Sequence, residues 1–152
     1  MADERASALM LMPAAVLVVV ILGAIAVDSA RLFLAQRELI DAAAAAANDA
    51  TGAAIDDGAF YRASGRLTID PAGATRVVQE AVAARAPRGM VLAPAEVRVS
   101  GRQVCVLLRA TVEPLFARAI PGAGEPQVVT ARATATAAGG ADGPVVPVGG
   151  LC

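Results

Sequence analysis

Residues 8–27 have the sequence ALMLMPAAVLVVVILGAIAV, and residues 28–50 follow directly as DSARLFLAQRELIDAAAAAANDA. The first stretch contains no charged residue and is dominated by Leu, Val and Ile. At about 1.5 Å per residue, its 20 residues form a helix of about 30 Å, the hydrocarbon thickness of a bilayer. The second stretch is rich in Ala, Leu, Arg, Gln and Glu, which favour helix. The sequence therefore predicts one N-terminal rod that crosses a membrane and continues as an amphipathic helix.

Two other classes of segment share this composition. The buried helix of a soluble protein is one, but such helices seldom lack polar groups over this length. A cleaved signal peptide is the other, and Ala24-Ile25-Ala26 fits an A-x-A cleavage site. Against cleavage, the preceding MADERAS is not positively charged, and the run exceeds the usual apolar region of about 7–15 residues. We expect a single-pass anchor, with a soluble secreted module released after Ala26 as the alternative.

The helix beyond the membrane has an apolar stripe at near-helical spacing. Its residues are Leu32, Phe33, Leu39, Ile40, Ala43 and Ala47. We expect this stripe to pack either on the domain's own sheet or on helices of neighbouring subunits, and both interpretations stay open. Asp28 lies at the edge of the predicted membrane segment. It either marks the start of the aqueous phase or contacts a partner protein.

Local signals predict the first elements of the domain. Asp56-Asp57-Gly58 indicates a turn, and within residues 60–69 Leu67 and Ile69, which follow Ser64-Gly65, indicate a short strand. Asp70-Pro71 is typical of a helix start, with an N-cap carboxylate followed by proline. Apolar residues then recur at helical spacing from Ala74 to Val82, and Pro87 ends that helix.

The hydrophobic period changes to two from residue 95. Gly101-Arg102 predicts a two-residue hairpin turn in which Val99 faces Val104. In that register the alternate residues 104–112 share one apolar face, and Cys105 points to the opposite, solvent side. A connection with one helical turn then leads to a strand over residues 127–136.

These elements define an α+β fold. It has a long N-terminal transmembrane and amphipathic helix, a second short helix and a small antiparallel sheet of about three strands. The expected regions are a cytoplasmic end (1–7), the membrane helix (8–27), its amphipathic continuation (28–51), a small extracytoplasmic domain (52–138) and a flexible tail (139–152). The N-terminus is placed inside because the C-terminal part is typical of a secreted fold; the charges flanking the span barely discriminate.

Two cysteines, Cys105 and Cys152, match no zinc-ligand spacing. Outside the cytoplasm they can pair or remain two separate thiols. The predicted hairpin favours the bridge, because it turns Cys105 away from the core and toward the tail. A bridge between them stabilises the fold by about 4 kcal/mol in the chain-entropy model.

The composition argues against catalysis. The chain has no His and no Lys, so the commonest general bases, Schiff-base nucleophiles and metal ligands are missing. Its 13 Arg balance 14 acidic residues, and no basic patch indicates nucleic acid. We therefore expect no enzyme activity, no catalytic, cofactor or metal site, and no nucleic-acid partner.

The stretch GAIAVDSARLFLAQRELIDAAAAAANDA resembles the TadE/TadG-like proteins of the Flp (tight adherence) pilus machinery. The N-terminal part of these proteins similarly has an apolar helix that ends in Val-Asp, then an Arg/Leu/Gln-rich segment and an Ala-rich stretch. The predicted hairpin, followed by PLFARAIPG and VVTARATATA, is similar to their C-terminal part. The resemblance implies a minor-pilin-like or assembly subunit of the inner membrane that contacts the lipid bilayer and other Tad subunits. The Gly and Glu of prepilin-peptidase sites are absent from RASALMLMP, so we expect the anchor to stay whole.

Overall fold

The computed structural model describes residues 3–62, 67–85, 87, 89–120, 122–138 and 152. The elements follow in the order α1 (Asp3–Ala53), α2 (Asp57–Arg62), α3 (Pro71–Ala84), β1 (Met90–Leu92), β2 (Glu96–Ser100), β3 (Gln103–Val112), the 3-10 turn η1 (Ala117–Ala119) and β4 (Gln127–Thr136). This is the expected α+β class. Within these residues the sheet has four strands rather than about three.

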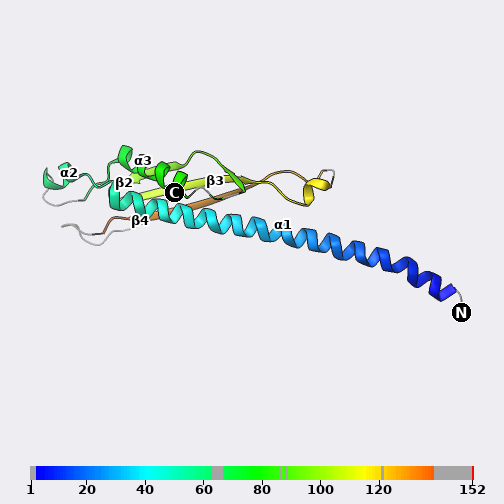
Figure 1. Cartoon of the computed structure of the whole chain (residues 1–152). Coiled ribbons are helices and arrows are strands. Elements are labelled where there is room, and N and C mark those ends of the chain that lie inside the picture. Colours follow the sequence, from blue (N-terminus) through cyan, green and yellow to red (C-terminus); the bar gives the residue numbers. More distant parts are fainter. Residues whose placement is uncertain (1–2, 63–66, 86, 88, 121, 139–151) are drawn as a thin grey trace.

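Helix α1 runs from the apolar segment into the domain without interruption. Figure 1 shows the N-terminal end of α1 projecting beyond the domain, whereas its C-terminal half lies along the sheet. The helix ends at Ala53, two residues beyond the expected boundary. Near this end the Thr51 hydroxyl donates a hydrogen bond to the carbonyl oxygen of Asn48 at 2.8 Å. A single continuous helix thus connects the apolar segment to the domain.

The segment after α1 differs from the sequence-based prediction. Asp57 begins helix α2 instead of lying in a turn, and this helix continues to Arg62. An acidic residue in the first turn suits a helix N-terminus, which favours this outcome. Ser64-Gly65, which precedes the strand predicted at Leu67 and Ile69, lies outside the described residues. At the predicted strand, Ile69 forms an isolated antiparallel bridge with Ile55.

Helix α3 begins as the sequence predicts. The Asp70 carboxylate accepts hydrogen bonds from the backbone N–H groups of Ala72 (3.1 Å) and Gly73 (2.8 Å), and Pro71 occupies the first helical position. The helix ends at Ala84, before Pro87. Its buried residues are Gly73, Ala74, Val78 and Ala81.

Strand β3 is the centre of the antiparallel sheet. It pairs with β4 over its whole length, from Gln103↔Thr136 to Val112↔Gln127. Because β4 pairs along one side of β3, β2 and β1 both pair with its other side. β2 lies beside residues 103–107 of β3, and β1 lies beside residues 110–112. The hairpin has the predicted register, with Val99 opposite Val104 and Gly101 at a φ of 56°. The sequence missed β1, because three residues are too few to show a period of two.

The core lies between the sheet and the two longer helices. Buried side chains of α1 and α3 join the inward face of β3 and β4 in one cluster. The β3 residues in it are the alternate positions Val104, Val106, Leu108, Ala110 and Val112, as predicted. Ala and Val dominate this core, so it buries little apolar area per residue.

Candidate functional site

The inward face of α1 is built mainly from alanine. Four stripe residues lie here: Leu39, Ala43 and Ala47 are buried, and Leu32 is half-buried against the same core. They are accompanied by Ala35, Ala42, Ala46 and Ala50. Among the buried residues of α1 that the structure describes, Leu39 has the one large apolar side chain. Side chains that end at Cβ let the helix backbone approach the sheet closely.

The outward face of α1 carries the other two stripe residues, Phe33 and Ile40. Their side chains are 66% and 45% exposed. Successive residues of an α-helix are rotated by about 100° around its axis, so Phe33 cannot share a narrow contact with Leu32. The same rotation separates Ile40 from Leu39. The single stripe of the sequence is therefore two surfaces, one facing the domain and one left bare.

Asp28 ties the anchor helix to the β3–β4 loop (residues 113–126). Its Oδ1 accepts hydrogen bonds from the backbone N–H groups of Leu115 (2.8 Å) and Phe116 (3.2 Å). Its Oδ2 accepts from Phe116 (3.1 Å) and Ala117 (2.8 Å). Three consecutive N–H donors thus surround one carboxylate. The partner of Asp28 is a loop of its own chain, about ninety residues further along the sequence.

Hydrogen bonding controls the ionisation of Asp28. Partial desolvation by itself raises the pKa of this carboxyl group. The N–H donors of Ala117, Leu115 and Phe116, together with the charge of Arg31, outweigh it, so the pKa lies below its ordinary value of 3.8. The carboxylate is therefore charged at neutral pH, the form that binds three donors best.

The β3–β4 loop presents apolar side chains that the sequence analysis did not single out. Leu115, Phe116 and Ile120 are 43%, 46% and 54% exposed. Phe116 and Ile120 border a hollow of about 340 Å³ whose other wall is α1, from Val20 to Ser29. The sequence did contain a signal for this apolar surface. Leu115 and Phe116 precede the short helical turn of the loop, and Ile120 follows it.

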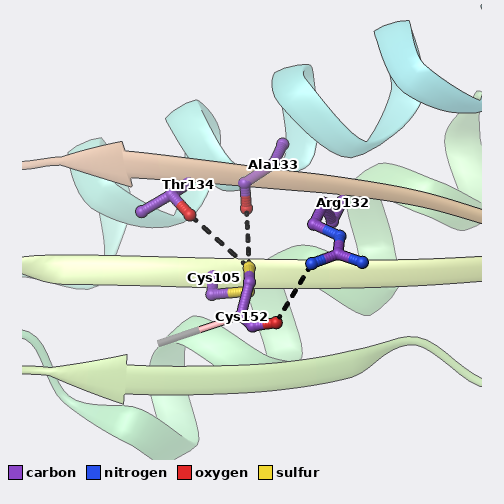
Figure 2. The surroundings of a disulfide bond; sticks show 5 residues. All are labelled: Cys105, Arg132, Ala133, Thr134 and Cys152. Carbon is purple, nitrogen blue, oxygen red and sulfur yellow. Dashed lines mark hydrogen bonds between the residues drawn. A yellow bond between two sulfur atoms is a disulfide. The ribbon is translucent and has the colours of Figure 1, made fainter. Parts of the chain in front are cut away.

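Cys105 and Cys152 are joined by a disulfide bond, with their Cα atoms 5.8 Å apart. Cys105 lies on the face of β3 opposite the core side chains, as alternation requires. The Cys105 side chain is only 2% exposed, however, so the prediction that it faces solvent is wrong. The reason is visible in Figure 2, where Cys152 lies over Cys105 and covers it.

Strand β4 supplies the polar contacts of the disulfide. The Thr134 hydroxyl lies 3.5 Å from the Sγ of Cys152 and is the donor, because a disulfide sulfur carries no proton. A guanidinium N–H of Arg132 donates to the main-chain oxygen of Cys152 at 3.5 Å (Figure 2). The bond and these contacts fasten Cys152 across β3 and β4. The predicted flexible tail, 139–151, lies outside the described residues.

Helix α1 is long and apolar enough to cross a membrane. Its most apolar 18-residue window has a mean hydropathy of 2.2, and none of that window is buried inside the protein. Since that window is uncovered, unlike the core helix of most soluble proteins, α1 could be a membrane span or a signal sequence. In the part of the chain that the structure describes, no group of three or more His, Cys, Asp or Glu is placed to hold a metal ion. No protein-family model, curated protein or solved structure matches this chain.

Proposed function

We propose that this chain is a membrane-anchored structural or assembly subunit, minor-pilin-like, of a bacterial Flp (tight adherence) pilus or a related secretion machine. It acts by helix packing and catalyses no reaction. Residues 8–27 hold it in the cytoplasmic membrane, and the α+β domain faces the extracytoplasmic side. The TadE/TadG-like resemblance of residues 23–50 supplies the family, and the geometry of α1 supplies the mechanism.

One observation carries the proposal: α1 is a single helix of 51 residues that is bare from Met12 to Val27 and packed against the sheet in its C-terminal part. Large exposed apolar residues cover the bare part from Met12 to Val27. An apolar surface of that extent needs lipid or protein to cover it. Because the helix continues into the core, any force on the anchor is transmitted directly to the domain.

The outward face gives this subunit a surface for neighbours. Phe33 and Ile40 are seven residues apart, so they align on one side of the helix, and they point away from the domain. They lie just beyond the membrane segment, where helices of adjacent subunits would run side by side. The inward stripe is already occupied by the sheet and cannot serve this purpose.

The disulfide supports the extracytoplasmic placement. Disulfides persist in oxidising compartments and are rare in the cytoplasm. The bond between Cys105 and Cys152 therefore favours a domain outside the cytoplasm. The alternative product, a soluble module beginning at Val27, requires cleavage of the bond between Ala26 and Val27, which lies in continuous helix. Proteolysis prefers exposed loops to regular helix, so we favour the intact anchor.

The test combines fractionation with site-specific photo-crosslinking of the full chain, expressed with the products of its neighbouring genes. A photoreactive phenylalanine replaces Phe33 or Ile40, and Tyr61 is the control because this aromatic residue is 83% exposed in α2. We expect a membrane-bound chain that retains Met1 or Ala2. We also expect discrete adducts with neighbouring subunits from positions 33 and 40, and none from position 61.

Two outcomes would contradict the proposal. A soluble product beginning at Val27 would establish the secreted module instead. A chain that stays in the membrane but gives equal or no adducts at positions 33, 40 and 61 would exclude packing through the outward face.

A further inference from the structure

The β3–β4 loop extends along the bare part of α1. Phe116 and Ile120 share a hollow with Val20, Ile21 and residues up to Ser29 of the helix. Figure 1 shows this yellow loop projecting beyond the rest of the sheet, toward the N-terminal half of α1. The exposed apolar side chains of the loop are therefore continuous with the apolar surface of the helix.

The depth of the loop follows from the helix geometry. Val20 lies seven residues before Val27, so it is about 10 Å inside the end of the proposed membrane segment at 1.5 Å per residue. Side chains that reach the level of Val20 and Ile21 are then within the outer leaflet. Amphipathic elements at a membrane interface bury their apolar face by about 5–10 Å, which is the same range.

The backbone of the loop is suited to an environment poor in water. Unpaired N–H groups are costly in lipid. The N–H groups of residues 115–117 bind Asp28. Further on, the N–H groups of Ala119, Ile120 and Ala123 donate to loop carbonyls at 2.9–3.1 Å. Pro114 has no N–H to satisfy. Among the described residues of the loop, the N–H groups of residues 115–117, 119, 120 and 123 are thus paired without solvent.

We propose that the β3–β4 loop is a membrane foot, with Phe116 and Ile120 inserted among the acyl chains of the outer leaflet and Leu115 at its surface. The inference rests on the proposed membrane span, because α1 carries the loop to the bilayer. Asp28 fixes the loop to the helix at the membrane edge, so the foot sets the height and tilt of the domain. The surrounding charges, Arg31 and Arg118 against Asp28, Glu113 and Glu125, are nearly balanced. The foot therefore requires apolar lipid chains and no anionic headgroup.

The natural chain contains no Trp, so one introduced Trp reports on one site. Full-length F116W and I120W are reconstituted in phosphatidylcholine vesicles with or without bromine on the acyl chains, which quenches Trp by contact. L22W, in the membrane segment, is the positive control. Y61W, in α2 at the opposite end of the domain (Figure 1), is the negative control. We expect brominated lipid to remove the emission of L22W, F116W and I120W, and to leave Y61W unchanged.

The controls separate the two proposals. If L22W is quenched while F116W and I120W behave like Y61W, the anchor stands and the membrane foot is excluded. If L22W itself is unquenched, the membrane span fails and the foot with it. A blue-shifted but unquenched F116W would mean that protein covers the loop, which also overturns the foot. Agreement between F116W and I120W guards against a local effect of either substitution.

Discussion

The two halves of α1 are both apolar helix, yet one is bare and the other is packed. Leu, Val and Ile dominate residues 12–27, and those side chains are exposed. Ala dominates residues 42–50, and most of those side chains are buried. The more hydrophobic half is thus the one that the protein leaves uncovered. Hydropathy alone does not decide which half of this helix the fold buries.

Side-chain size explains the difference. Bulky branched side chains surround the bare half with apolar area, which gains about 25 cal/mol per Å² when it leaves water for lipid. Alanines on the packed half bring the helix backbone close to the sheet, and interiors are packed too densely to admit larger groups there. If the proposed membrane span holds, membrane affinity and domain stability depend on different residues of one helix, and substitutions can separate them.

The largest effect is expected at Leu39, the large side chain on the packed face. Leu39→Ala leaves a cavity in a core that has few other large residues, so the free energy of unfolding should fall by about 2–5 kcal/mol. Denaturant unfolding of the full chain in micelles, followed by circular dichroism, measures this. Leu22→Ala is the matched control in the bare half, and it should leave the unfolding midpoint of the domain unchanged. Equal losses at the two positions would refute the division of the helix.

A smaller loss of unfolding free energy is expected from adding side-chain volume to the packed face of α1. Ala46 is fully buried, whereas Ala30 is exposed on the same helix. Ala46→Leu forces α1 away from the sheet and should cost about 1–3 kcal/mol. Ala30→Leu places the same side chain in open space and should change the unfolding free energy little. A harmless Ala46→Leu would mean that close approach of α1 to the sheet is not what the alanines provide.

The sequence predicts most of this fold because most of its signals are local. The continuous helix, the Asp70 cap and the Gly101 turn are each encoded within a few residues. The register of β2 and β3 followed from turn and alternation together. In contrast, β1 is too short to carry a pattern, and the turn predicted at Asp57 is the first turn of α2.

The candidate site was predicted less completely, because its contacts join distant segments. Six stripe residues were identified, but not the rotation that sends Phe33 and Ile40 outward. That division depends on where the sheet lies around the helix. Asp28 was noted at the membrane edge, while its loop partners lie almost ninety residues away. The sequence left open whether Cys105 and Cys152 form a disulfide or remain two separate thiols. That Cys152 lies over Cys105 and buries it depends on the tertiary structure.

The smallest effect is expected at Asp28, where the two halves of α1 meet. Its pKa is lowered, so the ionised form is favoured by folding, and this stabilisation is present above the ordinary value of 3.8. It is lost as the pH falls through the lowered pKa of the folded state. The amide resonances of Leu115 and Ala117, followed by NMR in micelles during acid titration, should therefore shift with a midpoint below 3.8.

Asp28→Asn tests whether this acid transition belongs to Asp28. The amide side chain keeps one acceptor oxygen but no charge, so the loop should be held more weakly and the acid transition at Leu115 and Ala117 should disappear. The unfolding midpoint of the domain should hardly move, because the loop lies outside the core cluster. A transition that persists unchanged in Asp28→Asn would show that it does not belong to Asp28. The apolar segment and the domain would then be connected by the helix alone.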